Sequence, residues 1–196
     1  MKLETERLIL RKPSLRDVKD HFEGINNFEV TKHLSSVPYP YTEEMSRQYI
    51  RKLQREWRQN PLKKYSFFIE LKEEGKMIGA LGTSEKNFGI WETGSWLNRK
   101  YHQKGYMTEA KIVLNEFVFN ELGARKMETS AYAENIASNK TQLGVGYKYE
   151  GCKRKEILSK ATGKYHDSNL YGLLREEWKA FLPKLQKKLE EKVKRL

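Results

Sequence analysis

Hydrophobic and polar residues follow two different periods along this chain. Apolar residues at every second position predict half-buried strands, and apolar residues at every third or fourth position predict amphipathic helices. The strand period covers residues 5–11, 65–71, 77–83, 90–97, 126–132, 147–158 and 167–174. The helical period follows Ser14, follows Thr42, and returns between Gly105 and Gly123 and between Asn135 and Gly144. The chain therefore interleaves the two kinds of element rather than grouping them.

Local start and stop signals support these boundaries. Ser14 followed by Asp17 resembles a capping box, and Thr42 precedes the apolar face of the next helix as an N-cap residue. Gly123 stands where a C′ glycine ends a helix. The predicted order is β-α-α-β-β-β-α-β-α-β-β. This order predicts an α/β (α+β) mixed fold, in which a central twisted β-sheet is flanked by helices.

The chain divides into a main domain and a basic tail. No internal repeat and no linker rich in glycine or serine interrupts residues 1–178, so these residues are expected to form one domain. Residues 179–196 place apolar side chains on one helical stripe among lysines, which predicts a basic amphipathic C-terminal helix with Pro183 in its first turn. The pattern fits three placements of this helix: packed on its own domain, in a homodimer contact, or docked on an acidic surface.

Charge and cysteine content narrow the class of protein. The chain of 196 residues has a net charge of +12, which suits nucleic acid, an acidic membrane or a polyanionic cofactor. No apolar run approaches the roughly 18 residues that span a bilayer, and the first residues lack the apolar core of a signal peptide. We therefore expect a cytoplasmic protein without membrane contact. Cys152 is the single cysteine, so we expect neither an internal disulfide nor a metal site.

The junction from Trp96 to Ala110 carries the most specific chemistry. An apolar strand meets a short basic loop, which opens into a long helix near Gly105. The first amides of a helix lack internal partners and carry partial positive charge, so this place suits a pyrophosphate. Gly105 allows the backbone to approach a ligand because it has no Cβ. With a second block at residues 134–151, the junction predicts an enzyme that holds a phosphorylated carrier and transfers its load.

A set of ordered segments repeats the pattern of a known family. The segments are Thr5 to Leu8, Pro38 to Thr42, Lys104 to Ala110, Asn135 to Ser138, Tyr165 to Asp167 and Leu173 to Trp178. They resemble the GNAT superfamily of N-acetyltransferases, and within it the branch of the RimJ and RimL ribosomal-protein N-terminal acetyltransferases. The resemblance implies a GNAT-like fold and an acetyl-CoA-dependent enzyme that acetylates a primary amine by direct attack. It also implies a protein N-terminus as one acceptor, and ribosome association is a possible consequence.

The resemblance implies a role for several residues. Glu92 is the expected general base, acting on the acceptor amine through a water. The amide of Leu97 is the expected oxyanion donor, an interaction worth ~3 kcal/mol, and Ser138 is expected to stabilise or protonate the leaving thiolate. The expected cofactor-binding residues are Leu97, Asn98, Arg99, Gln103, Lys104, Gly105, Tyr106, Met107, Thr108, Asn135 and Lys140.

The expected acceptor site and the ordinary alternatives stay open at this point. Tyr39, Tyr41 and Trp91 either line the acceptor cleft or are core and loop aromatics. Glu92 is alternatively a solvated or lysine-paired strand residue, and Ser138 is alternatively bonded to the helix backbone. The histidines at positions 21 and 33 carry no signal and are expected at the surface.

Two departures from the family pattern separate the catalytic assignment from the cofactor assignment. His102 and Met107 fill the first and last places of the superfamily's cofactor motif. Gln142 stands where many relatives have a tyrosine acid, and an amide cannot usefully protonate a thiolate. The alternatives are therefore a small-molecule amine acetyltransferase, a non-catalytic acetyl-CoA-binding module with a basic partner-binding tail, and an RNA-binding protein without a cofactor.

Overall fold

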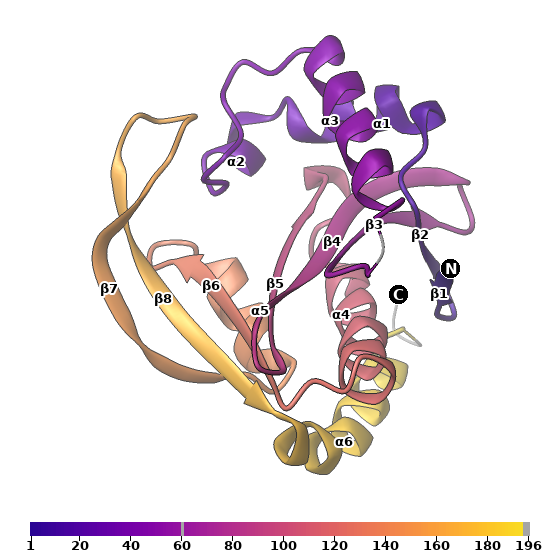
Figure 1. Ribbon diagram of the computed structural model, residues 1–196, viewed down its shortest axis with the longest axis vertical. Coiled ribbons are helices and arrows are strands. Elements are labelled where there is room, and N and C mark those ends of the chain that lie inside the picture. Colours follow the sequence, from indigo (N-terminus) through magenta and orange to yellow (C-terminus); the bar gives the residue numbers. More distant parts are fainter. Residues whose placement is uncertain (60, 194–196) are drawn as a thin grey trace.

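The chain forms one eight-stranded sheet with helices on both faces (Figure 1). The computed structural model describes residues 1–59 and 61–193. The strands lie in the spatial order β1-β2-β3-β4-β5-β6-β8-β7. Their bounds are β1 Lys2–Glu4, β2 Leu8–Arg11, β3 Lys64–Leu71, β4 Lys76–Asn87, β5 Ile90–Leu97, β6 Lys126–Tyr132, β7 Lys148–Leu158 and β8 Tyr165–Leu174. The predicted mixed fold is confirmed.

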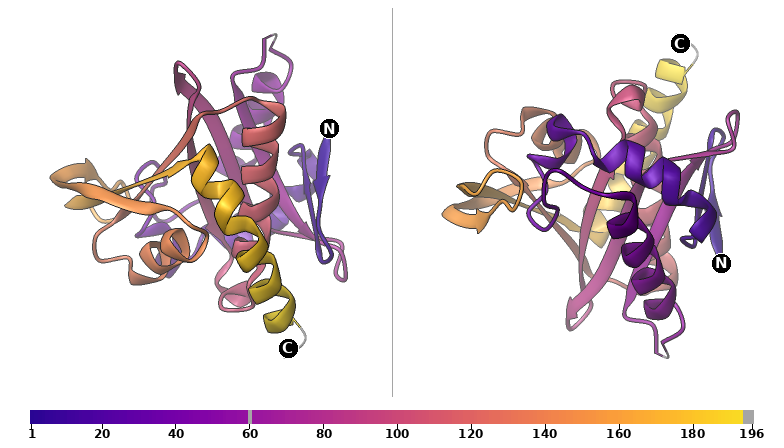
Figure 2. Two further views of the ribbon diagram at one scale, coloured as in Figure 1. Left: turned by 90° about the horizontal axis from the view of Figure 1, so that it is seen from below. Right: turned by 90° about the horizontal axis from the view of Figure 1, so that it is seen from above.

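The helices form a layer on each face of the sheet. The layer of α1, α2 and α3 covers one face, and α4 and α6 lie on the other (Figure 2). The bounds are α1 Val18–Ile25, α2 Phe28–Thr31, α3 Glu43–Glu56, α4 Tyr106–Glu116, α5 Ile136–Gly144 and α6 Arg175–Val193. The short helix α2 and the strand β1 are additions to the predicted order.

Side-chain caps fix the helix starts where the sequence predicts them. The Ser14 amide donates to Asp17 at 3.0 Å, which completes the capping box. The Thr42 hydroxyl accepts from the Met45 amide at 3.2 Å and caps α3. The predicted single strand at residues 5–11 is wrong: Thr5 lies in a turn between β1 and β2, because its hydroxyl accepts the Leu8 amide at 3.0 Å.

The sheet opens between its two central strands. β5 and β6 run parallel and pair from Ile90 with Lys126 as far as Thr93 with Thr129. Beyond that point β5 stays paired with β4, while β6 stays paired with β8. The edge of β5 from Gly94 to Leu97 therefore faces a gap in the sheet (Figure 1). Since α4 is the crossover connection between these parallel strands, its start lies at the same end of β5 as the gap.

The main core lies between the sheet and α4, and α6 seals its edge. Trp178 and Leu185 of α6 are buried in this core, so the tail helix packs on its own domain. α6 begins at Arg175, before the predicted boundary at residue 178, and Pro183 lies inside the helix rather than in its first turn. In the described residues, no helix combines the length and the apolar character of a bilayer-spanning segment.

Candidate functional site

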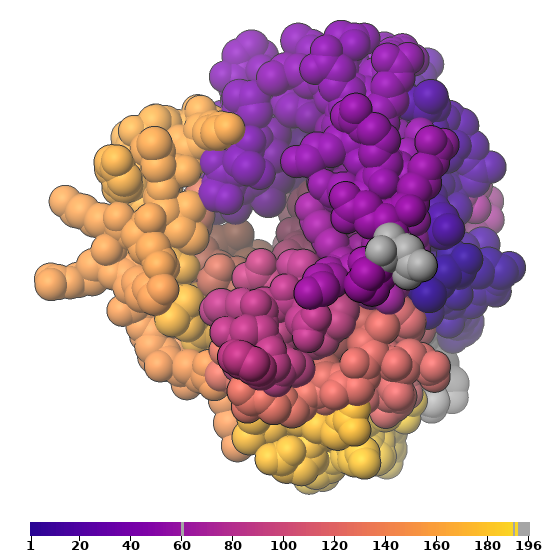
Figure 3. Space-filling model, viewed as in Figure 1, coloured from indigo at the N-terminus to yellow at the C-terminus, as the bar shows by residue number. Residues whose placement is uncertain are grey.

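A cavity of about 970 Å³ lies between the α1–α3 layer and the sheet. The β7–β8 hairpin forms its far wall, and Figure 3 shows the hollow between this hairpin and the helices. The Lys160 amide donates to the Ser35 carbonyl at 3.1 Å and joins the hairpin to the loop after α2. This hydrogen bond joins two walls of a cavity that stays open to solvent between them (Figure 3).

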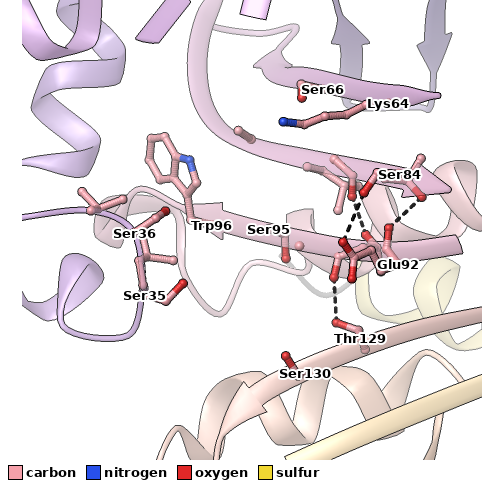
Figure 4. Close-up of a pocket in the computed structure, with 18 of the residues that line it drawn as sticks. Ser35, Ser36, Lys64, Ser66, Ser84, Glu92, Ser95, Trp96, Thr129 and Ser130 are labelled. Atoms are coloured by element: carbon pink, nitrogen blue, oxygen red, sulfur yellow. Dashed lines mark hydrogen bonds between the residues drawn. The ribbon is translucent and has the colours of Figure 1, made fainter. Parts of the chain in front are cut away.

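Glu92 projects from β5 into this cavity (Figure 4). Ser84 donates to Glu92 Oε1 at 3.3 Å, and no cation lies within ion-pair distance of Glu92 among the described residues. The other glutamates that line the cavity are paired with lysines, at 2.9 Å for Glu128–Lys86, 2.9 Å for Glu150–Lys126 and 2.6 Å for Glu156–Lys153. Glu92 is therefore the carboxylate of the cavity that stays available to a bound amine.

Serine hydroxyls line the cavity from the region of Glu92 to the region of Trp96 (Figure 4). Those without a side-chain hydrogen bond to the described part of the chain are Ser35, Ser36, Ser66, Ser95 and Ser130. A hydroxyl both donates and accepts, so these side chains can bond the amides and carbonyls of an extended acceptor.

A buried histidine closes the other end of the cavity. The sequence-based expectation for His21 is wrong, because the side chain is only 1% exposed and lies against Phe68 and Trp96. Burial lowers the pKa of His21 to about 4, so the ring is neutral near pH 7. Its Nδ1 lies 2.9 Å from the Ser46 hydroxyl. His21 follows Val18 and precedes Ile25 at helical spacing, and that apolar stripe is the signal that could have found it.

The three predicted acceptor aromatics separate in the structure. Tyr41 lines the cavity, and burial raises its pKa to about 12. Tyr39 is 44% exposed and packs on Phe28 outside the cavity. Trp91 is 5% exposed and lies in the core beside Tyr65, because its side chain points to the face of the sheet opposite to Glu92. Trp91 and Tyr39 are thus the core and loop aromatics of the alternative interpretation.

Backbone amides line the gap between β5 and β6. The Asn98 amide donates to the Ile78 carbonyl of β4 at 2.8 Å, and alternation along β5 turns the amides of Leu97 and Ser95 the other way, into the gap. His102 Nε2 lies 2.9 Å from the Leu97 carbonyl and donates to it. The imidazole therefore holds the end of β5 in place. Asn98 is buried, and its side chain accepts the Lys100 amide at 3.1 Å.

The first turn of α4 faces the same gap with free amides. Gln103 (φ 65°) and Gly105 (φ 83°) both adopt left-handed backbone before the helix. Such a turn gathers successive amides into a concavity that binds anions. Gly105 is the N-cap residue and provides no capping side chain, so the amides that follow it stay available to a ligand. Lys104 is exposed beside them.

A buried ion pair fixes this loop, and the sequence analysis did not identify it. Glu109 of α4 is 4% exposed and pairs with Arg7 at 2.6 Å. Arg7 also donates to the Lys104 carbonyl at 3.1 Å, and the Thr5 hydroxyl donates to Glu109. The first segment of the family-like pattern therefore holds the loop that precedes α4.

The predicted residues of α5 lie on the far side of the gap. Asn135 accepts the Ser138 amide at 3.1 Å and caps the helix. The Ser138 hydroxyl makes no hydrogen bond within the described residues. A further residue, Asn139, accepts from Tyr171 at 2.5 Å and from Asn169 at 3.0 Å, which ties α5 to β8.

Polar atoms are buried where α5 meets α4. Gln142 is 3% exposed and its Oε1 has no partner among the described residues. Lys111 of α4 is 1% exposed, and burial lowers its pKa to about 8. Its Nζ lies 5.9 Å from the centre of the Tyr147 ring. Arg99 and Lys140 are exposed, and Tyr106, Met107 and Thr108 are half-buried or buried in the first turn of α4.

Comparisons with known proteins find acetyltransferases by domain, by sequence and by structure. Residues 7–148 match the acetyltransferase (GNAT) domain. An uncharacterized N-acetyltransferase of Bacillus licheniformis, p20, is 30% identical over 180 residues, which cover 90% of this chain and 97% of that protein. A GNAT-family acetyltransferase structure from Bacillus anthracis has a TM-score of 0.77 at 25% identity, over 90% and 99% of the two chains. A ribosomal-protein-S5-alanine acetyltransferase structure from Vibrio fischeri has a TM-score of 0.71 at 22% identity, over 91% and 98%.

Proposed function

The chain belongs to the GNAT family of N-acetyltransferases, and on that premise we propose that it transfers acetyl from acetyl-CoA to a primary amine by direct attack. The observation that carries this proposal is the gap between β5 and β6. Along the unpaired edge of β5, the amides of Leu97 and Ser95 point into this gap, and α4 begins beside the gap. Glu92 lies on the same strand and opens into the cavity. One strand thus connects the anion-binding loop to a carboxylate in an acceptor site.

The residues that would hold acetyl-CoA suit its chemistry. The amides after Gly105 fit a pyrophosphate because a helix start favours negative charge. The backbone edge from Gly94 to Leu97 can bond the amides of the pantetheine arm. When bound, acetyl-CoA supplies an activated thioester carbonyl. Arg99, Lys140 and Asn135 are proposed to complete this binding site.

The acceptor half of the reaction is assigned to Glu92. The amine must lose a proton before its nitrogen forms a bond to the acetyl carbon and the carbon–sulfur bond breaks. Glu92 is proposed to take that proton through water rather than by direct contact. The reason is that Leu97, the proposed oxyanion donor, lies five residues away, roughly 16 Å along an extended strand. The Ser95 amide lies closer to Glu92 on the same edge and is a second candidate oxyanion donor. Ser138 is proposed to donate to the departing thiolate, since buried Gln142 carries no acidic proton.

A protein N-terminus is the proposed acceptor class. The serine hydroxyls that line the cavity can bond successive peptide groups. The structural likeness to a ribosomal-protein acetyltransferase agrees with this choice. A small-molecule amine is the second candidate, because the hydrogen bond between Lys160 and Ser35 narrows the space between the hairpin and the helices. A homodimer stays a prediction.

Release of free CoA tests the proposal. The purified chain is titrated with acetyl-CoA by calorimetry and then assayed against a panel of N-terminal peptides and small amines. We expect saturable binding, and turnover that is faster with peptides than with amines of similar basicity. Faster turnover with small amines would overturn the acceptor class alone. Saturable binding without turnover above hydrolysis would favour the non-catalytic module, and the absence of binding would overturn the whole proposal.

A further inference from the structure

Three arginines gather toward the C-terminal end of the outward face of α3. Arg51 and Arg55 lie one turn apart on α3, and Arg58 follows in the next turn, where its amide donates to the Arg55 carbonyl at 3.1 Å. Helical spacing places these side chains opposite to the buried Ile50 and Leu53. They line a groove of about 600 Å³, the arginine groove, which consists of Leu15, Gln48, Arg51, Gln54, Arg55 and Arg58.

The arginine groove has no internal counter-charge. All three of its arginines are exposed, and none lies within ion-pair distance of a carboxylate in the described part of the chain. The nearby acids are held by other side chains. Glu43 pairs with Arg47 at 3.0 Å, and Glu56 pairs with Lys64 of β3 at 3.1 Å. Glu44 pairs with Arg47 at 3.5 Å and accepts a hydrogen bond from Gln48 at 3.2 Å. Solvated helix faces usually mix the two signs. A groove of a single sign on a rigid helix is suited to an anionic partner.

Two glutamines give the groove free hydrogen-bond acceptors. Gln48 Nε2 donates to Glu44 at 3.2 Å, and Gln54 Nε2 donates to the Pro13 carbonyl at 3.2 Å. Their Oε1 atoms accept no hydrogen bond within the described residues. An ionised phosphate or carboxylate has no proton to give to these oxygens, whereas a ribose 2′-hydroxyl does. The groove therefore offers guanidinium groups to phosphates and carbonyl oxygens to a sugar.

We propose that the arginine groove binds the sugar–phosphate backbone of double-helical RNA. Arginine binds phosphate with two parallel N–H groups, which suits a regular series of phosphates. Single-stranded RNA is bound by stacking on aromatic side chains, and no aromatic side chain lines this groove. The centres of protein interfaces combine arginine with well-packed tryptophan and tyrosine, whereas this groove has no aromatic residue and Leu15 is its single apolar residue.

The position of the groove connects RNA binding to the acceptor cavity. α3 presents Tyr49 and Leu53 to the cavity and the arginines to the opposite side. RNA docked on α3 would leave the cavity uncovered. If the acceptor is a protein carried on structured RNA, docking raises its local concentration near Glu92. This last step rests on the proposed function, whereas binding of RNA does not.

A matched pair of triple variants tests the proposal. Arg51→Gln/Arg55→Gln/Arg58→Gln removes the charge of the groove, and Lys184→Gln/Lys187→Gln/Lys188→Gln removes the same charge from exposed positions of α6. Binding is measured by fluorescence anisotropy with a labelled RNA duplex of about 20 base pairs, longer than the roughly 16 that a duplex-binding domain covers. We expect the groove variant to bind at least about tenfold more weakly, with a salt slope lower by about 2 to 3. The α6 variant should stay within about threefold.

A second comparison separates RNA from other polyanions. The duplex RNA, a duplex DNA of the same sequence, the single-stranded RNA and a polyglutamate peptide are compared on the intact chain and on Gln48→Ala/Gln54→Ala. We expect duplex RNA to bind tightest, and the glutamine variant to lose its preference for RNA over DNA. Equal losses in the two triple variants would overturn the proposal as diffuse attraction. Preference for single strands or for polyglutamate would overturn it as well. Calorimetry with acetyl-CoA on each variant keeps this result separate from the proposed function.

Discussion

At the residue scale, Glu92 differs from the other glutamates of the cavity because it has no lysine partner among the described residues. Ion pairs with lysines hold the other cavity glutamates, whereas Glu92 has only the Ser84 hydroxyl among the described residues. A carboxylate that acts as a base must be free to exchange protons with a bound amine or water. The resemblance to the family predicted Glu92 from its place on the strand. Its freedom from lysines could not be predicted, because Lys86 and Lys126 come close only when β4, β6 and β7 align.

Replacing Glu92 by glutamine should reduce catalysis without reducing acetyl-CoA binding. We expect kcat to fall about 10²- to 10⁴-fold near pH 7, because general base catalysis contributes about that much. The deficit should shrink at high pH, where the acceptor amine loses its proton to solvent. Glu128→Gln is the matched control, since Glu128 lines the same cavity but is paired with Lys86. Initial rates of CoA release measure both variants, and similar losses in the two would contradict the role of Glu92.

His21 should make the stability of the fold depend on pH. Its pKa is about 4 in the folded protein, mainly because burial disfavours the charged ring, against an ordinary value of 6.5. The unfolded chain therefore binds more protons between these values, so the stability that His21 contributes is complete above pH 6.5 and is lost as the pH falls toward 4. We expect a loss of roughly 3 kcal/mol from this group. The free energy of unfolding in urea is measured at several pH values across this range. The slope of this free energy against pH should be smaller in His21→Phe/Ser46→Ala, where the second substitution removes the hydroxyl that would otherwise lose its partner. An unchanged slope would rule out a neutral buried His21.

At the element scale, the best predictions came from strands with one helix-covered face. β5 and β6 have the predicted bounds, because core packing on one face enforces strict alternation. The N-terminal hairpin was missed, since its turn depends on the Thr5 hydroxyl rather than on glycine or proline. The start of α6 was predicted too late because it follows β8 directly, with no loop residues between them to mark the change. The tie from Arg7 to Glu109 joins residues about half the chain apart, which no local pattern reveals.

The turn before α4 should depend on Gly105 for binding as well as for stability. Gly105 has φ 83° and Gly75, in the β3–β4 turn, has φ 63°. Replacing either glycine by alanine places alanine in a left-handed backbone conformation. Each substitution should therefore lower the free energy of unfolding by about 1–2 kcal/mol. Only Gly105→Ala should also raise the Kd for acetyl-CoA, by about tenfold, because only that turn presents helix amides to a pyrophosphate. Chemical unfolding and calorimetry measure the two effects. If Gly75→Ala weakened acetyl-CoA binding equally, global destabilisation would explain the result and the anion-binding turn would not.

At the scale of the whole molecule, the sheet lies between the cavity and the helix α4. The cavity lies on the α1–α3 face, and α4 packs on the opposite face with Trp91 and Leu97. The gap between β5 and β6 connects the two faces. A thioester held along the gap and an amine held in the cavity can therefore be bound at the same time. This arrangement does not require a covalent acetyl-enzyme.

Simultaneous binding predicts sequential kinetics. When the concentrations of acetyl-CoA and acceptor are both varied, double-reciprocal plots of the initial rates should intersect, whereas a covalent intermediate gives the parallel lines of ping-pong kinetics. Cys152, the only thiol of the chain, lies exposed on the edge strand β7, so Cys152→Ser should keep wild-type kcat. Mass spectrometry of the enzyme incubated with acetyl-CoA alone should show no acetylated species that disappears when acceptor is added. Such a species, together with parallel plots, would contradict direct attack and indicate a two-step transfer. The proposed role of Glu92 would then have to change, because the acceptor amine would not take part in the first step.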